Sequence, residues 1–298
     1  MKQVDAAPQL QWLALSLSPN IGASTLNNLR EYFDQDLDAV LQAPSYQLMR
    51  VRGVGPKIAS EIGAIDLDRL AQDLEAWRAD GIEILMRGGE HYPQPLKETS
   101  DLPLALFTSR IMSPQIWSNA VAIVGTREPS KEARYITLQL AMQLARADRA
   151  VVSGLALGID TAAHTGALSA DGVTVAVLGS GIGNIYPEAN RSLALRIRDK
   201  GALLSETHPH WSANAQRLVS RNRIVSGLCR AVIVVESDAD GGAMYTARFA
   251  VEQGRPVYTF DLPAGGNQRL IAEGARVLRR DDPLRDLPGN LAPTSSTE

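Results

Sequence analysis

The sequence predicts a doubly wound α/β fold with a mostly parallel sheet. Three apolar runs, at residues 121–124, 151–152 and 173–178, each end at a glycine or a Ser-Gly pair, with helix-like segments between them. Buried parallel strands read as continuous Val, Ile and Leu runs, because helices cover both faces of the sheet. Ligands of such sheets bind at the carboxyl ends of the strands, so these glycines and serines mark the candidate site.

The composition is that of a globular protein without disulfides or metal. The chain has 298 residues, 45% of them hydrophobic, which is enough for one large domain and a small one. Its net charge of −3 neither demands nor forbids nucleic acid, because a local basic groove can lie on a mildly acidic body. The single cysteine, Cys229, excludes an internal disulfide, and its neighbours predict a buried, unreactive thiol. No Cys/His cluster has zinc-site spacing, so we expect no metal and no cofactor.

The N-terminal residues do not resemble a targeting segment. They lack the basic start and apolar core of a secretion signal. No apolar run approaches the ~18 residues that span a bilayer. We therefore expect a cytoplasmic protein without a membrane partner.

Residues 1–80 are predicted to form a small helical domain. Apolar residues at helical spacing predict helices near residues 10–17 and 22–33, and residues 66–77 are expected to form a connecting helix.

Residues 48–62 have the form of a helix-hairpin-helix: an apolar residue, a Gly-x-Gly turn made by Gly53 and Gly55, and a second helix. In that motif the turn and the helix start present backbone N–H groups to a DNA phosphate, and Lys57 adds a positive charge. These three residues are therefore candidate DNA contacts. The alternative is a tight turn in a small helical bundle.

Residues 81–288 are predicted to form the α/β domain, because strands and helices alternate regularly as in βαβ units. Strands are expected near residues 82–85, 104–107, 121–124, 150–152, 173–178, 202–204, 231–235 and 256–259. Helices are expected near residues 130–147, 158–170, 188–199, 213–227, 242–253 and 268–273. Residues 289–298 are too polar and too short to fold, which predicts a flexible tail.

The turn Gly125-Thr126-Arg127 is a candidate phosphate site. Neither the Gly-x-Gly-x-x-Gly nor the P-loop spacing occurs here, which disfavours dinucleotide and P-loop nucleotide binding. A Gly-Thr-Arg turn that enters a helix nevertheless supplies free N–H groups, the positive end of the helix dipole, a hydroxyl and a guanidinium. The alternative is an ordinary strand-to-helix turn with a surface arginine.

Other small residues are expected along the same edge of the sheet, where they let an extended ligand approach the backbone. Gly241 and Gly242 open a further helix, and several helix starts in line make a row of phosphate sites. The residues of this kind are Ser153, Gly154, Gly179, Ser180, Gly181, Gly241, Gly242 and Thr246.

Three arginines cluster around Asn222 and are candidates for a basic rim. On a helix Arg217 and Arg221 share a face, whereas Arg221 and Arg223 are roughly 200° apart. One of the latter two is therefore expected to be structural. The alternative for the other is a solvated helix face.

Asp160 and His164 are four residues apart, so they can meet on one helix face. No nucleophile or metal partner is evident for them. We therefore expect a structural hydrogen bond that orients the start of the helix.

Taken together, these residues resemble the DNA-processing protein A (Smf) family. The resemblance covers residues 120–278, and the helical N-terminus is also similar to the family's own. Its main segments are Val-Ala-Ile-Val-Gly-Thr-Arg127, Ser153-Gly-Leu-Ala-Leu-Gly-Ile-Asp-Thr-Ala-Ala-His164, Ala176-Val-Leu-Gly-Ser-Gly181, Arg221-Asn-Arg-Ile224 and Leu270-Ile-Ala-Glu-Gly-Ala275.

This resemblance implies an extended Rossmann-like domain behind a SAM-like helix-hairpin-helix domain. It also implies binding of single-stranded DNA, a homodimer, and loading of a RecA-type recombinase in natural transformation or recombination, without catalysis. Carried over residue by residue, the family's phosphate turn is Gly125 to Arg127. Its groove falls on Gly179 to Gly181 and on Gly241-Gly242, and its basic wall on Arg221 to Arg223.

The chain departs from the family pattern at several positions. Thr126 replaces the usual Ser and keeps the hydroxyl, and Gly241 replaces a Ser. Residues 218–220 replace a Phe-Pro pair. Glu188 stands where many relatives have a basic residue, and its charge repels a phosphate backbone.

Two other function classes stay open. Nucleotide phosphoribohydrolases share a Gly-Gly helix start, but their catalytic Glu falls seven residues after the first Gly, which is Arg248 here, with Glu252 nearby. A nucleotide sensor using the same cleft is the second alternative. For single-stranded DNA, the 5% aromatic content predicts that phosphate contacts dominate and that affinity falls steeply with salt.

Overall fold

The computed structural model describes residues 6–18, 20–99 and 103–288, so the predicted tail at residues 289–298 lies outside them. The chain divides into two compact units. One contains residues 1–92 and 101–107, and the other contains residues 93–100 and 108–298. The domain boundary expected after residue 80 stays a prediction.

The first unit is built from short helices around a common core. The predicted helices are present, and the series is α1 (Ala6–Ser16), α2 (Ala23–Tyr32), α3 (Leu37–Gln42), α4 (Ser45–Leu48), α5 (Pro56–Gly63) and α6 (Leu67–Ala79). The side chains of Asp36 and Asp66 cap α3 and α6 by accepting from backbone N–H groups three residues on. The apolar faces of these helices pack together around a buried cluster that includes Leu15, Leu29 and Ile62. In sheet order, β1 (Glu83–Met86) is next to β2 (Ala105–Thr108).

The Gly-x-Gly turn predicted between two helices joins α4 to α5. Gly53 has a φ of +87°, which a residue with a side chain rarely adopts, and Gly55 precedes the first residue of α5. Asn28 of α2 holds the turn by donating to the carbonyl of Arg52 at 2.8 Å. Lys57 is exposed and donates to Asn20 at 3.2 Å. The DNA contact at this turn stays a prediction.

The second unit contains a parallel sheet with the strand order β6-β5-β4-β3-β7-β8-β9. Its strands are β3 (Val121–Val124), β4 (Val151–Ser153), β5 (Thr174–Leu178), β6 (Ala202–Ser205), β7 (Ala231–Val234), β8 (Val257–Thr259) and β9 (Arg276–Val277). From β3 the chain runs outward to β6 on one side and then from β7 to β9 on the other. The strand order therefore reverses between β3 and β7, which is where doubly wound sheets bind ligands.

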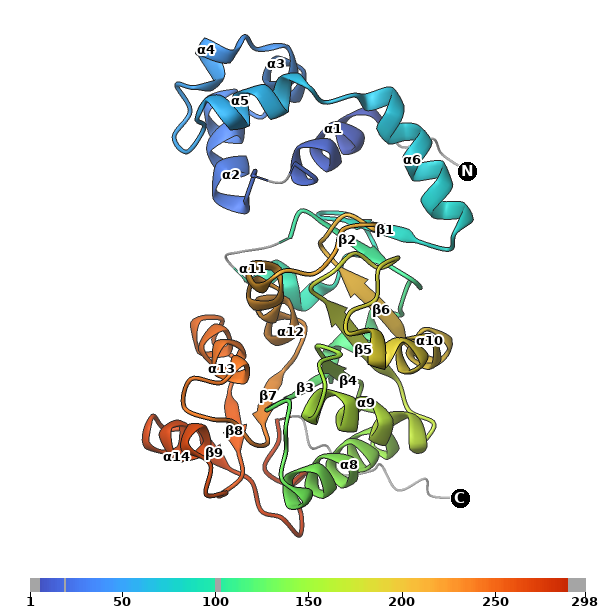
Figure 1. The fold of residues 1–298 in the computed structure, drawn as a ribbon, viewed down its shortest axis with the longest axis vertical. Helices are drawn as coiled ribbons and strands as arrows, with labels where there is room; N and C mark the ends of the chain where they lie inside the picture. The colour runs from blue at the N-terminus through green and yellow to red at the C-terminus, as the bar shows by residue number, and fades with distance from the viewer. Residues whose placement is uncertain (1–5, 19, 100–102, 289–298) are drawn as a thin grey trace, which may run out of the picture. The chain divides into compact units, whose positions relative to one another are not determined.

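Helices cover both faces of this sheet, as the apolar strand runs predict (Figure 1). They are α8 (Lys131–Arg146), α9 (Ile159–Ser169), α10 (Arg191–Lys200), α11 (Ala215–Ser220), α12 (Asn222–Gly227), α13 (Gly242–Glu252) and α14 (Gly265–Ala272). On one face α8 packs against α9, and on the other α12 packs against α13. The core between sheet and helices includes Val121, Leu140 and Tyr258.

The structure differs from the sequence prediction in several details, which include α3 and a 3-10 turn at Gln94–Glu98, neither of them predicted. The helix expected at residues 213–227 is divided into α11 and α12, and the helix expected at residues 188–199 begins as a short 3-10 turn, Glu188–Asn190. Helix α7 (Gln115–Ser118) and β9 were not predicted, because segments of four and two residues are too short to show a period.

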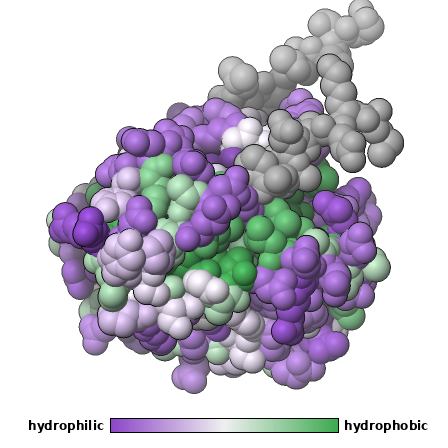
Figure 2. All heavy atoms as spheres, turned by 90° about the horizontal axis from the view of Figure 1, so that it is seen from above, coloured by the Kyte–Doolittle hydropathy of each residue, from purple (hydrophilic) through white to green (hydrophobic). Residues whose placement is uncertain are grey.

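Cys229 is buried, as predicted, and burial raises the pKa of its thiol. Among the described residues, no helix is long and apolar enough to cross a membrane. Figure 2 shows the molecular surface viewed from the top of Figure 1. On this face hydrophilic residues surround a strip of hydrophobic side chains. Apolar residues are common on protein surfaces, so this strip by itself assigns no site.

The turn from α10 into β6 sets a strict size limit at Gly201. A Cβ added there would lie 1.8 Å from the carbonyl oxygen of Thr174. We expect Gly201→Ala to lower the free energy of unfolding by about 3 kcal/mol, because strand backbone has to move. Urea denaturation measures this. The matched control is Gly242→Ala, where nothing lies within 4 Å of the added Cβ, and equal stability of the two variants would contradict the packing described here.

Candidate functional site

A cavity of about 790 Å³ opens at the carboxyl ends of β3 and β7, where the strand order reverses. It gathers residues from segments that are far apart in the sequence. The predicted site residues that line it are Gly125, Thr126, Arg127, Gly154, Arg221, Asn222, Gly241, Gly242 and Thr246.

The turn after β3 is held by backbone contacts with its neighbours. Thr126 donates its N–H to the carbonyl of Glu236 at 2.7 Å and accepts from the N–H of Ile159 at 3.1 Å. A Cβ on Gly125 would lie 2.5 Å from the Ile159 side chain, so only glycine fits. The sequence-based expectation of free N–H groups in this turn is wrong for Thr126, because the carbonyl of Glu236, just after the end of β7, accepts its N–H.

The start of α8 is also satisfied from within the protein. The Ser130 side chain accepts from the N–H of Ala133 at 3.1 Å. The Ser130 N–H donates to the carboxylate of Glu236 at 2.7 Å. Glu236 therefore occupies the position that an anionic ligand takes at a helix start. Glu236 was not among the residues predicted from the sequence, although its place directly after a buried strand run could have marked it.

Arg127 is the exposed cation of the cavity. Its charge acts on the buried Arg221, whose pKa it helps to lower. The cavity also contains carboxylates, so the two arginines do not make it strongly cationic. The acidic lining residues are Glu128, Asp160, Glu236 and Asp238.

Arg221 is buried, and its guanidinium bonds to backbone. Its Nη1 donates to the carbonyl of Gly154 at 2.6 Å and also to the carbonyl of Val177. A Cβ on Gly154 would lie 2.5 Å from Arg221 Nη2, so the guanidinium needs a glycine beside it. Burial lowers the pKa of Arg221 to about 10, with Asp160 opposing the shift, so the group stays charged at neutral pH.

Asp160 and His164 do not bond to each other, so the predicted pair is wrong. The Asp160 carboxylate accepts from the N–H groups of Gly154 and Ala156 at 3.0 and 3.2 Å, which does orient the start of α9. His164 Nδ1 lies 2.7 Å from Thr174 Oγ1. Because Thr174 donates its only hydroxyl proton to the carbonyl of Val151, His164 carries its proton on Nδ1. The two side chains share a helix face, but each finds a closer partner.

The three predicted arginines point to different places. Arg223 is buried and pairs with Glu206 at 2.6 Å, outside the cavity lining. Arg217 lies over the ring of Trp211, 4.7 Å from the ring centre to the guanidinium carbon. Arg221 and Arg223 thus both have internal partners, whereas helix spacing predicted this for one of them. Glu188 is exposed and lies 3.8 Å from Arg191.

The predicted glycines after β5 are covered by the protein's own chain. A Cβ on Gly179 would lie 2.8 Å from the Leu218 side chain, and one on Gly181 would lie 2.1 Å from the carbonyl oxygen of His208. Ser180 is fully buried, and Ser153 donates to the carbonyl of Ile123 at 2.6 Å. The close approach that the sequence suggested for a ligand is made here by residues 208–218.

The start of α13 is the open part of the cavity. Gly242 is exposed with nothing within 4 Å of its Cβ position, and Thr246 lies one turn further on, buried. Asn222 reaches the carbonyl of Gly242 at 3.5 Å. An anion in this cavity can therefore meet Arg127 and the N–H groups at the start of α13.

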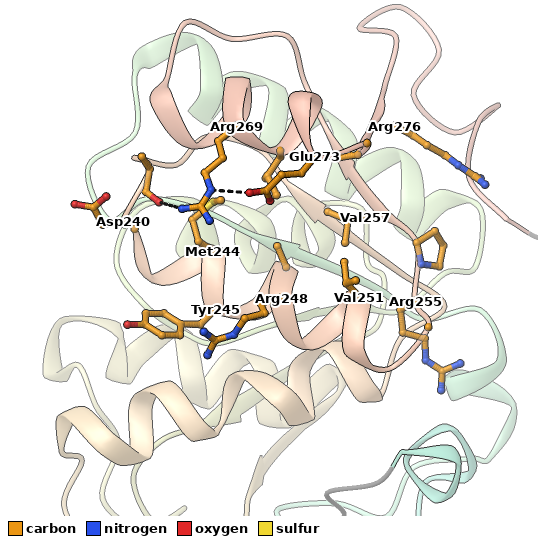
Figure 3. Close-up of a pocket in the computed structure, with 18 of the residues that line it drawn as sticks. Asp240, Met244, Tyr245, Arg248, Val251, Arg255, Val257, Arg269, Glu273 and Arg276 are labelled. Carbon is orange, nitrogen blue, oxygen red and sulfur yellow. Dashed lines mark hydrogen bonds and ion pairs between the residues drawn. The ribbon is translucent and has the colours of Figure 1, made fainter.

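A second cavity, of about 910 Å³, lies among α13, α14, β8 and β9. Figure 3 shows Arg248 beside Tyr245 and the ion pair that joins Arg269 to Glu273. Arg248 also lies 3.8 Å from Glu252, so the position that carries the acid in phosphoribohydrolases holds a cation paired with the nearby carboxylate.

Comparison with known proteins identifies the family. The model of the DNA recombination-mediator protein A family matches residues 83–287. The chain belongs to this family. It is 35% identical over 226 residues to DNA processing protein DprA of Bacillus subtilis, covering 74% of this chain and 76% of that protein. It is 34% identical over 287 residues to the Smf protein of a Synechocystis strain, covering 93% and 71%.

Solved structures of relatives have the same fold, which confirms the predicted α/β class and the resemblance. The X-ray structure of DprA from Streptococcus pneumoniae matches with a TM-score of 0.74 and 29% identity, covering 96% of this chain and 99% of that one. DprA from Helicobacter pylori, solved for its single-stranded DNA binding mode, matches with a TM-score of 0.61 and 26% identity, covering 67% and 93%.

The buried His164 makes a testable contribution to acid sensitivity. Burial lowers its pKa to about 3 from 6.5, with the charge of Arg221 adding to the shift. The unfolded chain therefore binds a proton that the folded chain does not, and stability falls as pH drops from about 6.5 towards 3. We expect the wild type to lose roughly 2 to 3 kcal/mol more than His164→Gln between pH 7 and 4.5. Urea unfolding at each pH measures this, and parallel curves would contradict it.

Proposed function

We propose that this protein binds single-stranded DNA in the cavity at the carboxyl ends of β3 and β7, with a backbone phosphate against Arg127. The observation that carries the proposal is the position of Arg127: an exposed guanidinium at the point where the strand order reverses, in the same cavity as the open start of α13. Family membership and the DNA-binding relative from Helicobacter pylori support the same ligand.

In this proposal the lining residues have different roles. Arg127 and the N–H groups at Gly242 face the phosphate. Thr126 accepts from the N–H of Glu128 at 3.2 Å, so its hydroxyl proton is available to a phosphate oxygen. Arg221 and Gly154, which are hydrogen-bonded to each other, form part of the cavity wall. We assign no catalytic residue and no cofactor.

We further infer the cellular role that the family resemblance implies. The bound strand is incoming or recombining DNA in natural transformation or recombination, and the protein helps to load a RecA-type recombinase in the cytoplasm. We also propose a homodimer. The exposed edge strand β9 and the exposed side chain of Val251, which lines the same cavity as Arg276 of β9, support a contact between copies, because sheet edges favour association. The proposed DNA contacts at Gly53, Gly55 and Lys57 are secondary, because Lys57 already bonds to Asn20.

The decisive variant is Arg127→Ala. We expect it to bind an unstructured oligonucleotide about tenfold more weakly, because one charge-assisted phosphate contact is lost. The slope of log K against log salt should also fall by about 0.7. Fluorescence anisotropy over a salt series measures both quantities. Arg196→Ala, which removes an exposed arginine from α10, is the matched control. Equal affinity of wild type and Arg127→Ala at every salt concentration would remove Arg127 from the site.

The alternative functions use the same cavity but predict different ligands. A nucleotide sensor is stabilised against heat by a mononucleotide and not by an oligonucleotide. A phosphoribohydrolase releases free base from nucleoside monophosphates, although Arg248 stands where its acid belongs. A titration that compares single-stranded DNA, duplex DNA and mononucleotides separates these cases.

A further inference from the structure

Aromatic side chains are sparse in this chain, but three of them gather in the loop between β6 and α11. His208 stacks on Trp211, with ring centres 5.3 Å apart and planes inclined by 23°. His210 lies beside His208 at 5.9 Å and is exposed. Arg217 adds its guanidinium over the indole ring at 4.7 Å. The result is a cluster of stacked rings with a cation, which we call the His-Trp-Arg cluster.

Backbone hydrogen bonds hold the loop that carries this cluster. Gly181 donates its N–H to the carbonyl of Trp211 at 2.8 Å, and Gly183 donates to the carbonyl of Pro209 at 2.9 Å. Trp211 itself donates to the carbonyl of His208 at 3.0 Å. None of these bonds uses an aromatic side chain. One further bond in the loop does use a ring: His208 Nδ1 accepts the N–H of His210 at 3.3 Å. Replacing Trp211 or His210 therefore leaves the contacts that position the loop, whereas replacing His208 removes one of them.

The cluster lies next to the proposed DNA site along the chain. Helix α11 carries Arg217 in the cluster, and the following Leu218 and Val219 line the cavity that contains Arg127. The same loop covers the turn after β5, at the carboxyl edge of the sheet. A single helix, α11, therefore connects the cluster to the lining of the cavity that contains Arg127.

We propose that the His-Trp-Arg cluster stacks unpaired bases of the single strand whose phosphates bind in the cavity. Aromatic rings and arginine planes stack on any base without reading its sequence, and cationic residues beside them attract the backbone. This proposal rests on the proposed function and adds a base-binding surface that composition alone argues against. It makes binding depend on bases as well as on phosphates.

The test compares oligothymidylate with an abasic oligonucleotide of the same length, because the two differ only in their bases. We expect Trp211→Ala to bind oligothymidylate about tenfold more weakly and the abasic strand unchanged. Trp211→Phe should retain most of the affinity, and His210→Ala should give a smaller, base-dependent loss. Oligothymidylate should also quench the tryptophan fluorescence of the wild type more than that of Trp211→Phe. Tyr135→Ala, which removes an aromatic side chain that is 65% exposed on α8, is the matched control.

The outcomes separate this inference from the proposed function. If Arg127→Ala weakens binding of both strands while Trp211→Ala changes neither, the cluster has no role in binding and only this inference fails. Equal weakening of both strands by Trp211→Ala would also overturn it, because the ring would then act through folding of the loop. If the wild type binds neither strand, the proposed function fails and this inference fails with it.

Discussion

The buried guanidinium of Arg221 connects the junction of α11 and α12 to the segment from Gly154 to Asp160 and to β5, both of which are far from Arg221 in the sequence. It bonds to the loop after β4 at Gly154 and to β5 at Val177, and it lies close to Asp160 at the start of α9. A buried charge is costly unless it is paired and hydrogen-bonded, and here a carboxylate and two carbonyls meet that requirement. The wall of the cavity depends on this arrangement, because without Arg221 the Asp160 carboxylate loses its cationic partner and both carbonyls lose a hydrogen-bond donor.

The cavity balances charge in a way that limits where an anion can bind. Glu236 already satisfies the start of α8, and Asp160 already takes the N–H groups of Gly154 and Ala156. The start of α13 at Gly242 is open, and Arg127 is the exposed cation of the cavity lining. In the proposed function, recognition of a phosphate backbone therefore uses a small part of this edge, and the neighbouring carboxylates oppose binding of an unselected polyanion.

In the turn after β5, glycines that the sequence predicted to admit a ligand make room for another segment of the protein instead. Gly179 and Gly181 are glycines because Leu218 and the carbonyl of His208 approach their Cα atoms. The loop that makes this approach also presents Trp211 and His210. The small residues thus give room to a protein segment, and that segment carries the surface that we propose for bases. A low aromatic content says little about stacking when the few aromatic side chains collect at one place.

By itself, the sequence determined the sheet, its flanking helices and the edge on which the site lies, because apolar runs and helical spacing are local signals. Its motifs also identified the family and predicted that Gly125, Arg127 and Gly242 lie at the same edge of the sheet, where one cavity contains all three. Only the tertiary structure decided which N–H groups and guanidiniums are left for a ligand. Glu236, Gly154 and Glu206 take up groups of Ser130, Arg221 and Arg223 that residue type alone would assign to DNA. The physical reason is that a buried polar group bonds to whatever the fold places beside it, and these partners come from the segments that follow three distant strands, β7, β4 and β6.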